Sequence, residues 1–201
     1  MPERTSDPVG GFVASPVTTV HRWAMWELVR GEFTDPLGQS FTRSFVTSPG
    51  AVGVVALHET GPRGPDAVPR DEATVVLVRQ YRPALHRLTL ELPAGMRDVE
   101  GEEPLVTARR ELQEEVGLVA ESWVRLGRHV SAPGISDSQV EIFLARNLRE
   151  VDVDRHGPEE QHMTVERVPL NEALAMVSDG RIDDAKTVIG LLLTERLLRA
   201  S

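Results

Sequence analysis

The sequence contains no cysteine among its 201 residues, which excludes a disulfide framework and any metal or redox site built on thiolates. It also lacks long apolar runs, and those present, such as Val188 to Leu193, are far too short to cross a bilayer. The N-terminus has no basic head followed by an apolar stretch, so no secretory signal is indicated. We therefore expect a cytoplasmic protein with no membrane partner.

Basic residues are outnumbered by acidic ones. The sequence has 22 Lys and Arg against 31 Asp and Glu, which gives a formal net charge of −9. A broad electropositive surface for nucleic acid is therefore not expected. The hydrophobic content of 40% and the charged content of 26% are those of an ordinary soluble globular protein. An acidic protein that acts on an anionic substrate needs metal ions or local arginines to offset the repulsion.

Two common hydrolase patterns are missing as well. The six histidines show no metal-ligand spacing, so a zinc site is not supported. No serine lies in a Gly-x-Ser-x-Gly elbow, so a serine hydrolase is not supported either.

The chain divides into three segments by composition and hydrophobic pattern. Residues 1–16 carry Pro, Gly and Ser with little periodicity and are expected to form a flexible tail. Residues 17–48 indicate short strands broken by a turn at 35–38, and so few strands need a partner surface to bury both faces. Strands and helices placed in alternation in the main domain predict a mixed, three-layer α+β fold. That domain spans residues 49–201, with strands expected at 51–58, 74–80, 88–92, 123–129, 140–145 and 164–168 and helices at 171–177 and 186–199.

A further helix is expected after a break in regular structure at Pro93-Ala94-Gly95. It lies between Glu102 and Gly117, because Pro104 suits a first helical turn and Gly117 suits a helix end. Its apolar residues recur at helical spacing and form one stripe: Leu105, Ala108, Leu112 and Val116.

Three glutamates share the polar face of this helix. At about 100° per residue, Glu115 lies roughly 40° to one side of Glu111 and Glu114 roughly 60° to the other. Like charges at these spacings repel, so cations must compensate them, and Arg109 and Arg110 supply part of the compensation. Clustered carboxylates suit a hard cation such as Mg²⁺, or Mn²⁺ as a substitute. The alternative is a solvated acidic surface, which is common on helices.

The complete string decides between these two interpretations. Residues 110–118 read Arg-Glu-Leu-Gln-Glu-Glu-Val-Gly-Leu, and this string resembles the Nudix box at every specified position. Glu102 also lies at the distance before Arg110 that the box requires. The upstream glycine, Gly95, is one residue farther out than the pattern asks, and Met96 occupies its nominal place. The resemblance implies a loop-helix-loop for magnesium-dependent cleavage of diphosphates, preceded here by a loop with one additional residue.

Shorter matches extend the resemblance to the ADP-ribose pyrophosphatase branch of this superfamily. They are the stretches 80–82, 91–95 and 132–137 together with the N-terminal strand region, so the similarity runs from about residue 17 onward. It implies a three-layer α/β/α Nudix fold with a mixed sheet and a small N-terminal β region for dimerisation. It also implies a homodimer that hydrolyses the pyrophosphate bond of ADP-ribose to AMP and ribose 5-phosphate with metal-activated water.

The same resemblance implies a metal site and a general base. Glu111, Glu114, Glu115 and the backbone carbonyl of Ala94 are the implied metal ligands, and Arg110 is expected to orient the carboxylates. The base in this branch comes from a loop after the box. Glu159 and Glu160 are the acids in that segment, and the following residues favour Glu160.

Four residues are implied in substrate binding. Arg82 would hold phosphate or the terminal ribose, although an ordinary ion pair is the alternative. Arg43 would reach the site of the partner subunit, and Met96 stands at the loop position next to the box. Trp26, or Trp23, would stack on adenine, although tryptophan is more often structural.

Other functions remain open at this point. A Nudix enzyme for another nucleoside diphosphate sugar or dinucleotide fits the box equally well. A non-catalytic ADP-ribose sensor fits less well, because it needs an additional basic domain that the sequence lacks.

Overall fold

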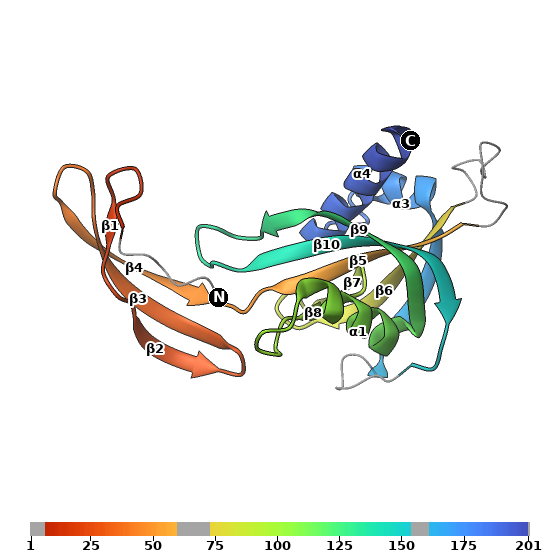
Figure 1. The fold of residues 1–201 in the computed structure, drawn as a ribbon, viewed down its shortest axis with the longest axis horizontal. Helices are drawn as coiled ribbons and strands as arrows, with labels where there is room; N and C mark the ends of the chain where they lie inside the picture. The colour runs from red at the N-terminus through yellow and green to blue at the C-terminus, as the bar shows by residue number, and fades with distance from the viewer. Residues whose placement is uncertain (1–6, 60–72, 154–160, 201) are drawn as a thin grey trace. The chain divides into compact units, whose positions relative to one another are not determined.

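A computed structural model describes residues 7–59, 73–153 and 161–200 (Figure 1). The chain forms two compact units, which are described separately. The first unit comprises the described part of Met1–Gly50 with Val130–Gln139, and the second comprises the described parts of Ala51–His129 and Val140–Ser201.

The first unit is a four-stranded antiparallel sheet in which β3 pairs with each of the other strands. The predicted turn between β3 and β4 is confirmed: Asp35 Oδ1 accepts hydrogen bonds from the N–H groups of Leu37 and Gln39 at 2.9 and 2.8 Å, and Gly38 has a positive φ of 85°. Residues 13 and 14 lie inside the expected flexible tail but pair with β3, so the tail interpretation does not describe them. The strands are β1 (Val13–Ala14), β2 (Thr18–Trp23), β3 (Trp26–Thr34) and β4 (Ser40–Thr47).

In the part of the second unit that the structure describes, there are a seven-stranded mixed sheet and three helices. The strand order is β11-β6-β5-β10-β9, with β7 paired to β6 and β8 paired to β5. Strands β5 and β10 run parallel, while β6, β8 and β11 pair antiparallel with their neighbours. The strands are β5 (Ala51–His58), β6 (Thr74–Arg82), β7 (Arg87–Glu91), β8 (Ala94–Met96), β9 (Leu118–Val130), β10 (Gln139–Glu150) and β11 (Thr164–Pro169), and the helices are α1 (Pro104–Val116), α3 (Leu170–Ser178) and α4 (Ala185–Ala200).

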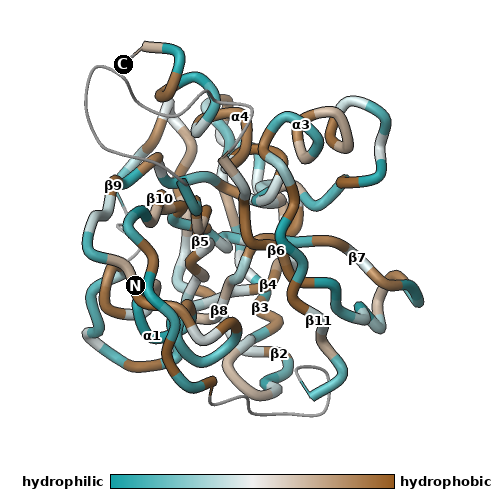
Figure 2. Tube along the Cα trace, turned by 90° about the vertical axis from the view of Figure 1, so that its right-hand side faces the viewer, coloured by the Kyte–Doolittle hydropathy of each residue, from teal (hydrophilic) through white to brown (hydrophobic). Residues whose placement is uncertain are grey.

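Both faces of this sheet are buried because its central strands carry apolar residues at consecutive positions rather than only at alternate ones. In β5, Val55 and Leu57 join the core that packs against α3 and α4, whereas Val52, Val54 and Ala56 join the core beneath α1. Figure 1 shows α1 on one side of the sheet and α3 and α4 on the other, and Figure 2 shows hydrophobic residues along β6 and α3. This arrangement confirms the predicted three-layer fold.

Helix α1 begins and ends where the sequence predicts. Pro104 occupies its first turn, and Gly117 closes it in the left-handed conformation with φ 64°. A Cβ atom at Gly117 would lie 2.7 Å from the carbonyl oxygen of Val151, so both the backbone conformation and the space require glycine here. The requirement for glycine at this position therefore defines where the C-terminal end of α1 lies.

The expected break at Pro93-Ala94-Gly95 is wrong in part, because residues 94–96 form strand β8. Ala94 pairs with Gly53 and Gly95 with Val52. Pro93 has no N–H for a ladder, but the edge of β5 offers hydrogen-bonding groups to the residues that follow it. The short strand brings Gly95 against α1. None of the helices in the described parts of the chain is long and apolar enough to span a membrane.

Candidate active site

Glu111 and Glu115 are buried on the face of α1 that meets β8, with exposed fractions of 9% and 4%. Glu115 Oε2 accepts a hydrogen bond of 2.9 Å from the N–H of Ala94. The Glu111 carboxyl packs directly on the backbone of Gly95, where any Cβ atom would overlap it. Because residue 95 is glycine, the buried carboxylate of Glu111 can occupy the space that a side chain would otherwise fill. Two carboxylates from consecutive turns of α1 meet the backbone of one short strand.

Arg110 is surrounded by carboxylates. Its Nη1 lies 2.9 Å from Glu111 Oε1 and 3.1 Å from Glu114 Oε2, and its Nη2 lies 3.2 Å from Asp98 Oδ1. Burial alone would lower the pKa of Arg110, but the charges of Glu111 and Glu114 outweigh it and raise that pKa above its ordinary value. Arg110 therefore holds Glu111 and Glu114 on one guanidinium. Arg109 does not share this role, because its guanidinium lies over the Trp123 ring at 5.9 Å.

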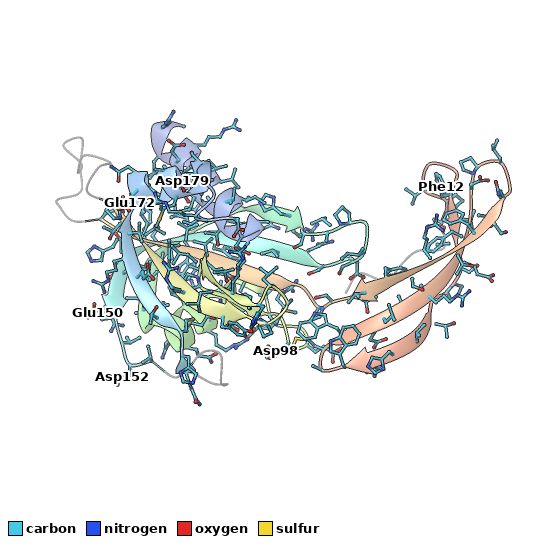
Figure 3. The ribbon with its side chains drawn as sticks, turned by 180° about the vertical axis from the view of Figure 1, so that it is seen from behind. Phe12, Asp98, Glu150, Asp152, Glu172 and Asp179 are labelled. Carbon is cyan, nitrogen blue, oxygen red and sulfur yellow. The ribbon has the colours of Figure 1, made fainter. Side chains whose placement is uncertain are left out.

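The loop between β8 and α1, which carries the additional residue, supplies two more acids. Asp98, labelled in Figure 3, lies in this loop and contacts Arg110. Glu102 accepts a hydrogen bond of 2.7 Å from the buried Thr107 hydroxyl. Gly101 has a φ of 77° next to a turn in which the N–H of Glu102 bonds the carbonyl of Val99 at 3.2 Å. The loop thus folds back on α1 and brings Asp98 to the orienting arginine.

Arg82 forms an ion pair with Glu91, a residue for which the sequence predicted no role. Its Nε and Nη2 donate to the two oxygens of Glu91, each at 2.7 Å. Glu91 is 2% exposed and also accepts hydrogen bonds from Thr89, at 2.6 Å, and from Lys186. Burial would raise the pKa of Glu91, but its bonds with Arg82 and the charge of Lys186 lower it to about 2. The ion-pair alternative considered for Arg82 is thus present, with a buried partner.

The remaining predicted substrate residues fall in different places. Met96 lies in β8, opposite Ala51 of β5 and next to the Gly95 that Glu111 contacts. Trp26 and Arg43 belong to the first unit. The Trp26 ring lies 6.3 Å from that of Trp23, and Arg43 stacks over Phe41 at 5.0 Å.

Arg43 also lines a cavity of about 500 Å³ within the first unit. The cavity walls include Phe33, Phe45, Pro133 and Asp137. Phe12, labelled in Figure 3, packs edge-on against Phe41 in the same unit. This unit therefore offers an aromatic and cationic surface around Arg43. The predicted base Glu160 and its neighbour Glu159 lie outside the described residues.

The chemistry of the buried pair suits a hard divalent cation. In the described parts of the chain, no group of three or more His, Asp or Glu side chains is placed to hold a metal. Mg²⁺ does not require such a group, because it is commonly bound by one or two protein carboxylates and completes its coordination with water and substrate phosphates. Glu111 and Glu115 provide two buried carboxylates, and the lack of a side chain at Gly95 lets the Glu111 carboxyl lie against the β8 backbone. The residues present therefore fit a magnesium site that is completed by the substrate.

Sequence comparison places these features in a known family. Residues 60–189, which include β8, α1 and the glutamate pair, match the NUDIX domain. The chain belongs to the NUDIX domain family. This result confirms the superfamily resemblance drawn from residues 110–118.

Relatives of this NUDIX chain share most of its length. The ADP-ribose pyrophosphatase of Mycobacterium tuberculosis (strain ATCC 25618 / H37Rv) is 39% identical over 174 residues, which cover 87% of this chain and 78% of the relative. The ADP-ribose pyrophosphatase of Bacillus subtilis (strain 168) is 35% identical over 156 residues, covering 78% and 77%. A crystal structure of an ADP compounds hydrolase superposes with a TM-score of 0.76 at 21% identity and covers 98% of both chains. At that identity the structural likeness supports the fold alone.

Sequence reasoning about the NUDIX domain missed Glu91 and Lys186. Glu91 follows Leu90 and precedes Leu92 in an alternating strand, and that pattern normally places the charged side chain in water. A signal for Lys186 did exist, because it is the only lysine in the sequence, where 21 other cationic residues are arginine. A chain that uses arginine elsewhere has a physical reason to use lysine where a compact ammonium group is needed.

Proposed function

We propose that this NUDIX-family chain hydrolyses the pyrophosphate bond of ADP-ribose and releases AMP and ribose 5-phosphate. The observation that carries the proposal is the buried pair Glu111 and Glu115, packed against the Ala94 and Gly95 backbone beside Arg110. Carboxylates are seldom buried unless they have partners or bind a metal. The two relatives named ADP-ribose pyrophosphatase support this choice of substrate.

Divalent metal is part of the proposal. Glu111 and Glu115 would hold Mg²⁺, with Mn²⁺ as a substitute, and Glu114 and the Ala94 carbonyl are the further ligands that we propose. When bound, such an ion offsets the charge of the diphosphate and lowers the pKa of the attacking water. Arg110 keeps Glu111 and Glu114 from repelling each other and fixes their side-chain conformations.

The other steps belong to residues of the chain itself. Glu160 accepts a proton from the attacking water, which adds to one phosphorus as the bond to the bridging oxygen breaks. Arg82 and Met96 are proposed to contact the substrate at the edge of β8, and Arg43 and Trp26 to contact it from a partner subunit. Arg82 is 42% exposed although Glu91 holds two of its nitrogens, so a part of its guanidinium remains accessible.

Hydrolysis of a substrate panel tests this function. Purified protein is incubated with ADP-ribose, several nucleoside diphosphate sugars and a dinucleotide, with and without Mg²⁺, and the products are identified. ADP-ribose is expected to give the highest kcat/KM, and AMP with ribose 5-phosphate the products. A higher kcat/KM for another nucleotide sugar would contradict the proposed substrate. Cleavage that is equally fast in chelator would contradict the metal.

Matched variants test the two assignments within the site. Glu111→Gln and Glu115→Gln are expected to lower kcat by about a thousandfold or more with the fold retained. Glu103→Gln is the control, because Glu103 is exposed at the same helix and makes no side-chain cap. For the base, Glu160→Gln should lower kcat with little change in KM, whereas Glu159→Gln should not. The reverse result would move the base to Glu159.

We further propose a cytoplasmic homodimer in which residues 17–48 form the dimerisation region and residues 49–201 the catalytic domain. Strand β2 is exposed along its whole length, and apolar Val20 is 57% exposed there, so this sheet has a face for a partner to cover. Light scattering at micromolar concentration is expected to give twice the chain mass. A monomer would contradict the dimer.

A further inference from the structure

Glu91 joins three elements of the second unit. Its carboxylate accepts hydrogen bonds from the guanidinium of Arg82 in β6 at 2.7 Å, from the hydroxyl of Thr89 in β7 at 2.6 Å and from the ammonium of Lys186 in α4. The Glu91 side chain is 3% exposed and that of Lys186 is 12% exposed. Exposed ion pairs contribute little to stability, but this pair is shielded from water and its partners are held in defined positions.

The first turn of α4 extends this network to the next residue of the chain. Lys186 lies 3.0 Å from Asp184, and the Thr187 hydroxyl donates to the same carboxylate at 2.6 Å. Thr187 Oγ1 in turn accepts a hydrogen bond of 2.9 Å from the N–H of Leu92. Glu91 and Leu92 are therefore both bound to the start of α4, one through its side chain and the other through its backbone.

The chain then passes directly to the glutamate pair. The Pro93 carbonyl accepts a hydrogen bond of 2.9 Å from the N–H of Val54, and the Ala94 N–H donates to Glu115 at 2.9 Å. Only Leu92 and Pro93 separate Glu91 from Ala94. A continuous series of contacts thus runs from Lys186 through Glu91 and the backbone of residues 92–94 to the carboxylate of Glu115.

A purely stabilising role explains this network poorly. Burying two opposite charges costs much of what their attraction returns, and well-packed apolar residues of similar volume often serve stability as well or better. Lysine is used once in this sequence, and it stands at the point where one ammonium must serve Glu91 and Asp184 together. The flat guanidinium that the chain uses elsewhere has a different donor geometry.

We propose that Lys186 is a positioning residue: together with Glu91 it holds Arg82 and the backbone of residues 92–94 so that Ala94 meets Glu115 in the geometry that hydrolysis requires. Lys186 itself touches neither substrate nor metal. The expected effect on turnover rests on the proposed function. The mechanical part, in which Lys186 and Glu91 hold the Ala94 N–H in place, does not depend on that function. That part is measurable without any substrate.

The test compares Lys186→Met with a control ion-pair variant, Arg79→Met. Arg79 pairs with Glu166 across β6 and β11 of the same sheet, and it lies on the strand that also carries Arg82. Amide hydrogen exchange of Ala94 is measured by NMR in the absence of substrate, and kcat and KM are measured well below the unfolding temperature. In Lys186→Met the protection of the Ala94 amide is expected to fall about tenfold, with a similar fall in kcat. In Arg79→Met neither quantity should change.

Two results would overturn the proposal. Unchanged Ala94 protection in Lys186→Met would remove the mechanical link, and normal kcat and KM despite lost protection would remove its bearing on the reaction. Should Lys186→Met fail to fold, the double variant Glu91→Gln with Lys186→Met removes both buried charges. A stabilising role predicts that this double variant regains activity with stability, whereas a positioning role predicts that it regains stability alone. If the wild type prefers another nucleotide sugar, the kinetics are run with that compound and only the substrate assignment fails.

Discussion

The backbone N–H of Ala94 in β8 donates a hydrogen bond of 2.9 Å to the carboxylate of Glu115 in α1. One residue further, the carboxyl of Glu111 rests on Gly95, which has no side chain to displace it. Backbone contacts as well as apolar packing therefore determine how α1 sits on the sheet. We expect small changes at these contacts to lower catalytic activity more than they lower the stability of the fold.

Gly95→Ala tests this contact. The added methyl group would overlap the Glu111 carboxyl, so Glu111 must move, and a displacement of about 1 Å in such a site lowers turnover by about a hundredfold. Steady-state kinetics measure the effect. Gly53→Ala is the control, because Gly53 pairs with Ala94 in the sheet. A Cβ atom at position 53 would lie 3.8 Å from Lys186 Cδ, which is an ordinary van der Waals distance. Equal activities of the two variants would contradict the role assigned to Gly95.

Arg110→Met should destabilise the protein in a salt-dependent manner. Without the guanidinium, Asp98, Glu111 and Glu114 repel one another, and we expect a loss of about 1 kcal/mol at low ionic strength that shrinks as salt screens the repulsion. Urea unfolding at low and high NaCl measures it. Arg199→Met removes one exposed pair with Glu195 and should show a smaller effect. A loss that is independent of salt would indicate packing rather than charge.

Glu91 should contribute to acid sensitivity. Its folded pKa of about 2 lies below the ordinary 4.5, so the folded state favours the carboxylate. The resulting stabilisation is complete above pH 4.5 and is lost as the pH falls toward 2, with a size on the order of 3 kcal/mol, since a tenfold change in a dissociation constant is about 1.4 kcal/mol. Glu91→Gln should therefore lose less stability than the wild type across this interval in urea titrations. Parallel pH profiles for the two proteins would rule out Glu91 as the source.

Gly117→Ala separates backbone strain from a steric clash. Gly117 has a φ of 64°, and its added Cβ would lie 2.7 Å from the Val151 carbonyl oxygen. Gly101 has a φ of 77° but has open space where its Cβ would lie, so Gly101→Ala carries the conformational cost alone. We expect about 1 kcal/mol for Gly101→Ala and about 3 kcal/mol for Gly117→Ala in chemical unfolding. Equal losses would mean that the Val151 contact relaxes freely.

Local patterns determined the helix that carries the glutamates. Pro104 and Gly117 mark its ends, and the spacing of Glu111 and Glu115 places both on one face, because these features depend only on helical geometry. The string from Arg110 to Leu118 was also sufficient to predict the family, which the match of residues 60–189 confirms. The layered fold followed from the order of strands and helices.

Only the tertiary structure decided what surrounds that helix. Strand β8 forms because the edge of β5 is available, and no local pattern around Pro93 reveals this. The partner of Arg82 is a glutamate whose place in an alternating strand predicts exposure, and the partner of Glu91 lies 95 residues away at Lys186. Contacts between residues so distant in sequence depend on how the layers pack. The sequence by itself therefore determined the helix and its chemistry. Packing of the layers decided which backbone groups and which charged side chains contact that helix.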